Sequence, residues 1–269
     1  MSNIFHSLIL GIVQGVTEFL PISSSAHLRL VPFLFNWPTD KLAFDVSLHF
    51  GTAIAILAYY WRDWISLFTK AFHWKSKEAI SSETDQFPDN LLWQILIATI
   101  PAGIAGVLLS KIEDRFGILL IAINLAVFGI IIALVDKYAK ESTKPTKLTY
   151  KQTFLVGLSQ CLALIPGVSR SGITILSSRF LGLPRETAAR FSFMLGTPAM
   201  IGAFLFELRH INSSDLTLAF FLAVAASAIS GFFAIRFLLN YLKRGNLNLF
   251  AWYRLAFALV IILIYLIRI

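Results

Sequence analysis

The sequence predicts an all-α polytopic membrane protein, a single membrane domain built from two inverted-topology repeats. Three observations predict this class: long apolar runs, two polar segments centred on proline between them, and basic residues gathered in alternate loops. The chain has 269 residues, 57% of them hydrophobic, and its mean hydropathy is +0.74. A soluble core does not require so much apolar sequence, whereas membrane-spanning helices do.

Six apolar runs are long enough to cross a bilayer as helices. They cover approximately residues 42–60, 91–110, 117–135, 187–206, 216–240 and 248–268. The single cysteine, Cys161, excludes internal disulfides and cysteine-based metal sites.

Basic residues are concentrated in the loops 62–90, 136–151 and 241–247. Cytoplasmic loops of membrane proteins carry an excess of Lys and Arg, so we expect these three loops in the cytoplasm and the loops 111–116 and 207–215 outside. The same bias explains the formal net charge of +8 without a nucleic-acid partner.

The two halves of the chain match at a fixed offset of 145 residues. Pro21 then corresponds to Pro166, Ser24 to Ser169, and the Gly51–Thr52 pair to Gly196–Thr197. Matches at one offset favour an internal repeat over chance agreement of common small residues. We expect repeat one at about 1–135 and repeat two at about 150–269.

Each repeat begins with a polar segment, about 4–36 and about 152–182, that we predict to be a re-entrant helical hairpin. Three spans follow each hairpin, giving six full spans, and an odd number of crossings inverts the second half relative to the first. The hairpin tips then meet near the bilayer midplane. The alternative is that each hairpin makes two full crossings, for ten in total. The interruptions at Pro21 and Pro166 favour re-entry.

The second tip reads Pro166-Gly-Val-Ser-Arg-Ser-Gly172 and is rich in groups that bind phosphate. Glycine permits close backbone approach, and the Arg170 guanidinium pairs with phosphate oxygens through two donors. A half-helix starting near Ser171 would point its amides and its positive dipole into the cavity. A structural role for Arg170, as counter-ion to Glu18, is the alternative.

The first tip carries Ser23-Ser24-Ser25 after Pro21, followed by His27. Serines at a helix start serve as N-caps, but three together facing an arginine favour a binding or catalytic role. Ser24 is the candidate nucleophile, and His27, three residues later on a helix, is a candidate base for it or for water. His49 is interpreted as structural.

Glu18 is the only acidic residue among the first 36, and Gln14 lies one helical turn before it. A carboxylate and an amide oxygen on one helix face suit a divalent cation, Mg²⁺ or Ca²⁺, which shares its shell with substrate phosphates. A metal-free pair of Glu18 with Arg170 is the alternative.

These motifs resemble those of the bacterial undecaprenyl-diphosphate phosphatases of the integral-membrane type. The resemblance covers essentially the whole chain. The first family motif falls on Gln14 and Glu18, and the second on Pro166-Gly-x-Ser-Arg-Ser-x-x-x-Thr174. Gln14 stands where the family often has Glu, and this departure puts in doubt that a carboxylate is essential at that position.

The resemblance implies a hydrolase that removes the terminal phosphate of undecaprenyl diphosphate, recycles the lipid carrier of cell-wall synthesis and confers bacitracin resistance. It also implies a divalent cation, a location in the bacterial cytoplasmic membrane and a site open to the outer face. A homodimer is possible, and membrane lipids and the polyprenyl diphosphate are the expected partners. The expected catalytic residues are Glu18, Ser24, His27 and Arg170, with Glu18 and Gln14 at the metal. The expected substrate-binding residues are Gln14, Ser23, Ser25, Gly167, Ser169, Ser171 and Thr174.

Two other functions remain open from the sequence. An inverted repeat with broken segments is also typical of transporters, so a polyprenyl-phosphate flippase is the main alternative. A lipid phosphatase with a histidine nucleophile would need a second histidine closely after a Ser-Arg segment, and only His210 follows Arg170.

Overall fold

The computed structural model describes residues 4–37, 42–72, 86–109, 115–208 and 211–268, and within them every regular element is a helix. Eleven α-helices and three short 3-10 helices are present there. The first half of the chain contains α1 (Ile4–Phe19), α2 (Ser24–Phe35), α3 (Leu42–Tyr59), α4 (Trp61–Ala71), α5 (Leu91–Leu108) and α6 (Ile118–Tyr138). The second contains η3 (Pro145–Lys147), α7 (Tyr150–Ser159), η4 (Gln160–Leu164), α8 (Arg170–Phe180), α9 (Arg185–Leu208), η5 (Ser213–Asp215), α10 (Leu218–Leu242) and α11 (Asn248–Arg268).

Five of the six predicted spans are helices long and apolar enough to cross a membrane, namely α5, α6, α9, α10 and α11. The chain is therefore a multi-pass membrane protein. The sixth prediction, about 42–60, falls on α3. The part of α3 that can be assessed, Ser47–Tyr59, is a shorter apolar helix, so a sixth crossing remains a prediction.

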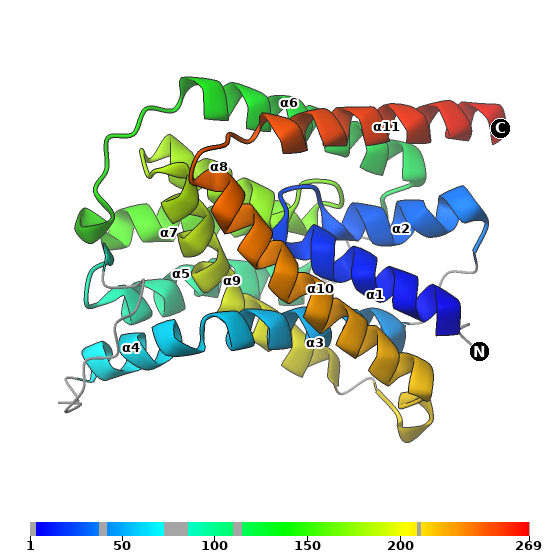
Figure 1. The fold of residues 1–269 in the computed structure, drawn as a ribbon, viewed down its shortest axis with the longest axis horizontal. Coiled ribbons are helices and arrows are strands. Elements are labelled where there is room, and N and C mark those ends of the chain that lie inside the picture. The colour runs from blue at the N-terminus through cyan, green and yellow to red at the C-terminus, as the bar shows by residue number, and fades with distance from the viewer. Residues whose placement is uncertain (1–3, 38–41, 73–85, 110–114, 209–210, 269) are drawn as a thin grey trace.

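Both predicted hairpins are pairs of short helices joined at proline. At about 1.5 Å per residue, the 16-residue α1 and the 10-residue α7 fall short of the roughly 30 Å hydrocarbon layer. In Figure 1, α1 and α2 occupy the end of the molecule where α11 finishes, and α7 and α8 occupy the opposite end. The two hairpins thus point toward each other, and their tips meet in the interior.

The halves pack against each other reciprocally. Helix α1 packs on α10 of the other half, α7 packs on α5, and the pairs α3–α9 and α6–α11 join equivalent elements. Close approach requires glycine at both hairpin contacts. A Cβ at Gly15 would collide with the α10 backbone near Ser227, and one at Gly157 would collide with Ala98 of α5.

Each tip turns through a serine with a positive φ angle. Ser23 has φ 75° and Ser169 has φ 79°, a conformation that costs a non-glycine residue about 1 kcal/mol or more. Each serine immediately precedes the helix that leaves its tip, α2 or α8. The strained positions are 146 residues apart, so at the tips the structure pairs Ser23, and not Ser24, with Ser169. The single offset of 145 is therefore wrong there by one residue, because two residues separate Pro166 from Ser169 and only one separates Pro21 from Ser23.

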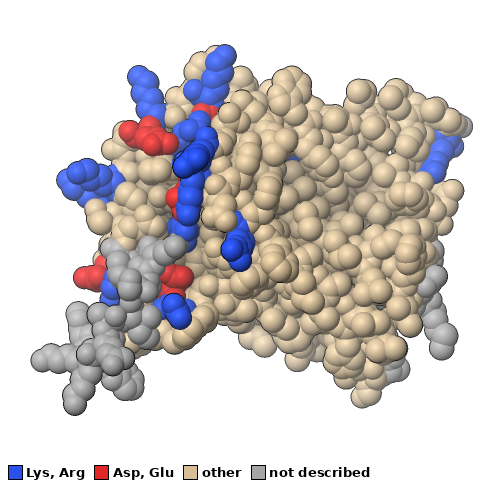
Figure 2. All heavy atoms as spheres, in the orientation of Figure 1, with Lys and Arg blue, Asp and Glu red and all other residues tan. Residues whose placement is uncertain are grey.

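Charged side chains gather at one end of the molecule. Figure 2 shows a band of basic and acidic side chains at the left end, a wide uncharged surface over the middle of this face, and basic side-chain atoms again at the right edge. The described parts of the three basic loops lie at the left end: α4, the connection between α6 and α7, and the connection between α10 and α11 (Figure 1). The prediction of a loop over 62–90 was wrong at its start, because α4 continues as a helix to Ala71. The apolar helices form the uncharged part of the surface, as expected for a protein surrounded by lipid.

Candidate functional site

The carboxylate of Glu18 is the centre of the polar cluster between the two tips. Its Oε1 accepts a hydrogen bond from the Arg170 guanidinium at 3.0 Å, and its Oε2 accepts one from Ser24 Oγ at 2.6 Å. Glu18 lies in the last turn of α1, Ser24 begins α2 and Arg170 begins α8. Three helix ends, from both halves of the chain, thus bring together three of the four predicted catalytic residues, and His27 makes its contacts elsewhere.

Gln14 lies one turn before Glu18 on the same face of α1, as its spacing predicted. Its Nε2 donates to Glu18 Oε2 at 3.1 Å and lies 3.1 Å from His49 Nδ1. Its Oε1 is buried without a hydrogen-bond partner. A buried acceptor left unsatisfied costs roughly 1–3 kcal/mol, so this oxygen has unused capacity to accept a hydrogen bond or to coordinate a cation. The contact also brings His49 of α3 to the site, which its position within an apolar run did not indicate.

Arg170 is held by a salt bridge on one side only. Its NH2 group donates to Glu18 Oε1 and lies 3.1 Å from Met200 Sδ. Its NH1 group is buried without a partner and lies against Gly196 of α9, where a Cβ would overlap it. The guanidinium is therefore both a counter-ion to Glu18 and a donor with unused hydrogen-bonding capacity.

The serines form matching pairs at the two tips. Ser23 and Ser25 have their hydroxyl oxygens 3.3 Å apart, and Ser169 and Ser171 have theirs 3.2 Å apart. Ser169 also caps α8 by accepting from the Gly172 amide at 3.1 Å. Ser171 donates to the Leu20 carbonyl at 3.2 Å, so it links tip two to tip one.

Two predicted substrate-binding residues make their contacts within the helix scaffold. Thr174 donates to the Arg170 carbonyl at 2.8 Å and lies within hydrogen-bonding distance of Ser192 in α9. Gly167 has φ 96°, and its carbonyl accepts from Arg254. These contacts position Arg170 and the tip.

Both ring nitrogens of His27 have partners other than Ser24. Nδ1 lies 2.8 Å from the Ser23 carbonyl, and Nε2 lies 2.7 Å from the Tyr253 hydroxyl. A carbonyl oxygen only accepts, so Nδ1 carries the proton and Nε2 of the neutral ring accepts from the tyrosine. The ring also stacks on Phe257, with centroids 4.6 Å apart. Tyr253 was not predicted, because an aromatic residue in an apolar run gives no signal of its partner.

Arg254 of α11 joins both tips from a fully buried position. Its guanidinium donates to Pro21 O at 3.1 Å and to Val168 O at 3.2 Å, in addition to the Gly167 carbonyl, and its Nε donates to Leu125 O of α6 at 3.1 Å. Sequence reasoning did not identify Arg254, although a charge inside the span 248–268 is the kind of signal that marks a constrained residue.

Comparison with known proteins shows the family to which this chain belongs. The model of the bacitracin resistance protein BacA family matches residues 7–260. The chain belongs to this family. The BacA-family match includes the whole polar cluster and Arg254.

Several curated relatives of this BacA-family chain carry the name undecaprenyl-diphosphatase. The protein from Pelotomaculum thermopropionicum is 45% identical over 264 residues, 97% of each chain. The one from Desulforudis audaxviator is 42% identical over 268 residues, 99% of each chain. The one from Moorella thermoacetica is 41% identical over 268 residues, 99% of each chain.

The donors at the BacA-family site suit a hard divalent cation. No group of three or more His, Cys, Asp or Glu side chains able to hold a metal occurs in the described part of the chain. The Glu18 carboxylate and the unpartnered Gln14 Oε1 are oxygen donors, and Mg²⁺ commonly uses one or two protein ligands together with substrate phosphates and water. The cluster therefore fits a cation that arrives with or is completed by the substrate.

Proposed function

We infer that this protein hydrolyses undecaprenyl diphosphate to undecaprenyl phosphate and inorganic phosphate. The observation that carries the inference is the Ser24–Glu18–Arg170 cluster, in which a hydroxyl, a carboxylate and a guanidinium meet at buried helix ends. The near-full-length similarity to proteins named undecaprenyl-diphosphatase supports it. The reaction recycles the lipid carrier of cell-wall synthesis and accounts for bacitracin resistance.

Substrate binding follows from the free donors at the tips. We propose that the terminal phosphate takes the place of the missing partner of Arg170 NH1. The N-termini of α2 and α8 add amides and positive dipole ends, and the glycines of tip two let the phosphate approach the backbone. Phosphoryl transfer depends chiefly on such positioning and charge neutralisation.

The first chemical step uses the short contact between Ser24 and Glu18. Ser24 Oγ attacks the terminal phosphorus and its proton passes to Glu18 Oε2, which already accepts that hydroxyl at 2.6 Å. A P–O bond to serine forms and the anhydride P–O bond breaks, so undecaprenyl phosphate leaves and a phosphoserine remains. Arg170 stabilises the charge that develops on the transferred group.

The second step regenerates the enzyme. The proton on Glu18 passes to the departing undecaprenyl phosphate, which restores the carboxylate. A water molecule then gives a proton to Glu18 as its oxygen attacks the phosphoserine, and the serine oxygen recovers that proton as inorganic phosphate departs. Direct attack by water on the diphosphate, with Ser24 only orienting it, is the alternative. Rapid-quench labelling with substrate carrying a radioactive terminal phosphate separates the two, because only the first route places label on the protein.

We propose that His27 acts mainly through tip one. Its hydrogen bond to the Ser23 carbonyl and its contact with Tyr253 hold the strained turn that presents Ser24. Proton transfer by His27 remains a prediction, since opening of the Tyr253 contact would free Nε2.

Glu18 and Gln14 are the residues that would hold a divalent cation, which would supply charge neutralisation for the diphosphate. Removing the cation with a chelator should lower phosphate release, and Glu18→Gln should weaken the dependence on added Mg²⁺ or Ca²⁺. Gln14→Ala should have the milder effect and Gln14→Glu should be tolerated. A more damaging Gln14→Ala than Glu18→Gln would contradict this assignment.

We further propose that the two halves are inverted repeats in the bacterial cytoplasmic membrane, with the site open to the outer face. The opposed hairpins and the reciprocal helix packing support it. In a Cys161→Ser background, single cysteines at Lys144 and Asn246 should react only with a cytoplasmic reagent, and one at Ser213 only from outside. Labelling of Lys144 from outside would reject this orientation.

Phosphate release by the purified protein in detergent tests the overall function. Detergent micelles have no two compartments between which a flippase could move a lipid. Release of inorganic phosphate from undecaprenyl diphosphate by the wild-type protein, and its loss in Glu18→Gln, would therefore identify a phosphatase. No release under any cation would favour the polyprenyl-phosphate flippase. Cross-linking in native membranes tests the predicted homodimer separately.

A further inference from the structure

Arg236 is a basic residue on the lipid-facing side of a spanning helix, outside the catalytic cluster. It is exposed on α10 and lies six residues before Leu242, where α10 ends, which places it about 9 Å along the axis from that end. The large exposed side chains Phe233 and Phe237 flank it. A charge in this position requires a compensating group.

Within the described part of the chain, no carboxylate forms an ion pair with Arg236. Arg170, Arg179, Arg185 and Arg190, in contrast, each pair with a carboxylate of this chain. An anionic lipid headgroup at this end of the molecule is a suitable counter-ion for Arg236.

An open hollow lies beside this guanidinium, along the exposed face of α10. It has a volume of about 610 Å³, and its lining residues all belong to α10: Phe233, Arg236, Phe237, Asn240 and Tyr241. One cation, one amide and one phenol are thus set among aromatic rings. Arginine pairs with phosphate through two parallel donors, and amide and hydroxyl groups complete the coordination of its other oxygens.

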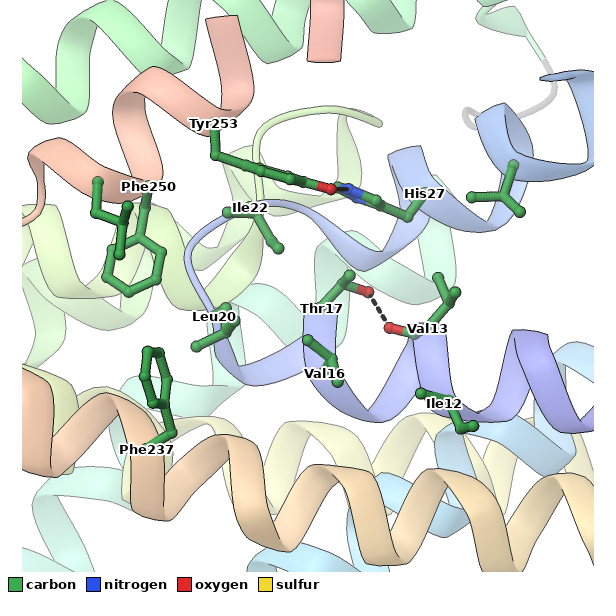
Figure 3. Close-up of a pocket in the computed structure, with 12 residues that line it drawn as sticks. Ile12, Val13, Val16, Thr17, Leu20, Ile22, His27, Phe237, Phe250 and Tyr253 are labelled. Atoms are coloured by element: carbon green, nitrogen blue, oxygen red, sulfur yellow. Dashed lines mark hydrogen bonds between the residues drawn. The ribbon is translucent and has the colours of Figure 1, made fainter. Parts of the chain in front are cut away.

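An apolar groove lies next to this hollow, and Phe237 lines both. The groove has a volume of about 500 Å³ and runs between α1, the first tip, α10 and α11. Figure 3 shows Phe237 and Phe250 at one end of it, Ile12 at the other, and His27 with Tyr253 along its upper wall. A phosphate-binding end and an apolar channel of this kind together match a molecule with a charged head and a hydrocarbon chain.

We propose that Arg236, Asn240 and Tyr241 bind the headgroup phosphate of an anionic phospholipid, whose acyl chain lies in the groove between α1, α10 and α11. Lys243 and Arg244 follow at the same end of α10, so the site lies at the basic end of the molecule, where anionic lipids of a cytoplasmic leaflet concentrate. The bound chain contacts Leu20, Ile22 and His27 and would steady the first tip.

Native mass spectrometry of the full-length protein with phosphatidylglycerol and phosphatidylcholine tests the site. The wild-type protein should retain phosphatidylglycerol in preference, and Arg236→Gln should lower that affinity about tenfold, the order expected for losing a charged hydrogen bond, while phosphatidylcholine binding stays unchanged. Lys243→Gln is the matched control, since it removes the same charge at the same end outside the hollow. Leu249→Trp, which narrows the groove, should reduce retention of both lipids.

Equal losses of phosphatidylglycerol in Arg236→Gln and Lys243→Gln would overturn the proposal and leave only a general attraction of the basic end for anionic lipid. Undecaprenyl phosphate is added as a competitor. If it displaces phosphatidylglycerol from the wild-type protein at a concentration below that of phosphatidylglycerol, and Arg236→Gln weakens this displacement, the site belongs to the reaction product and the proposal is overturned. All these variants should still release phosphate from the diphosphate substrate in detergent, so failure of this inference is distinct from failure of the proposed function.

Discussion

The two hairpin tips have nearly the same backbone but divide the chemistry between them. Both turn through a serine of positive φ, and in both a second serine hydroxyl lies within hydrogen-bonding distance of the first. Tip one then contributes the Glu18 carboxylate and the Ser24 hydroxyl, whereas tip two contributes the Arg170 cation. Two tips of similar backbone thus supply opposite charges to one point.

The difference also extends to how each tip is held. Ser169 caps its helix by accepting from the Gly172 amide, whereas Ser23 makes no side-chain cap. The first tip is instead held by the contacts of His27 with the Ser23 carbonyl and with Tyr253. Arg254 does not distinguish the tips, because it donates to Pro21 of tip one and to Gly167 and Val168 of tip two. We therefore expect tip two to be the more rigid and tip one to respond more to its neighbours.

The largest expected effect separates the nucleophile from its neighbour within tip one. Ser24→Ala should lower turnover by roughly 10³-fold or more, because the covalent route is lost, whereas Ser25→Ala should cost about tenfold or less. The measurement is phosphate release in detergent for both variants. If Ser24→Ala keeps about a tenth of the wild-type rate, the order expected for one lost hydrogen bond, water is the nucleophile.

A second change tests whether tip two supplies more than charge. Arg170→Lys keeps the cation but loses the planar fork, so turnover should fall about 100-fold, equal to roughly 2.7 kcal/mol of transition-state stabilisation. Arg185→Lys, at the Asp136 salt bridge near the end of the molecule, is the control and should remain near the wild-type rate. Near-normal turnover of a folded Arg170→Lys protein would remove Arg170 from the reaction.

A third change loosens the two tips from each other. Arg254→Lys leaves a buried cation with too few donors for the four carbonyl groups that Arg254 serves. Each charged hydrogen bond contributes roughly 1.5–3 kcal/mol, so we expect a clear fall in the apparent Tm together with about a tenfold loss of turnover. Arg268→Lys, at the exposed end of the same helix, should change neither. An unchanged Tm for Arg254→Lys would mean that the tips are held independently.

The smallest effect compares the serine turns directly. Ser169→Ala removes a helix cap and should cost about 1 kcal/mol, whereas Ser23→Ala removes no cap and should cost less. The positive φ and the neighbouring serine are common to both sites, so their effects on the free energy of unfolding cancel when the two variants are compared. Equal shifts in apparent Tm would show that the capping bond of Ser169 adds nothing to stability.

Hydropathy and proline placement alone predicted most of the fold. The spans α5, α6, α9, α10 and α11 occur where the apolar runs stand, because a bilayer requires about 20 apolar residues per crossing. The breaks at Pro21 and Pro166 agree with proline's missing amide hydrogen and its preference against helix before it. Proline alone does not decide a break, since Pro32, Pro101 and Pro198 lie inside helices. The sequence likewise indicated Glu18, Ser24 and Arg170, because costly polar groups among apolar runs stand out.

Only the tertiary structure decided which of these groups meet. Contacts such as Ser24 with Glu18, His27 with Tyr253 and Arg254 with Pro21 join residues up to 233 positions apart, and no local pattern encodes such pairings. The strain at Ser23 and Ser169, and hence the one-residue shift of the repeat, is likewise invisible in residue type, because serine rarely adopts a positive φ. The sequence determined which residues were costly to place in a membrane, and the packing of two opposed hairpins determined which of them satisfy one another.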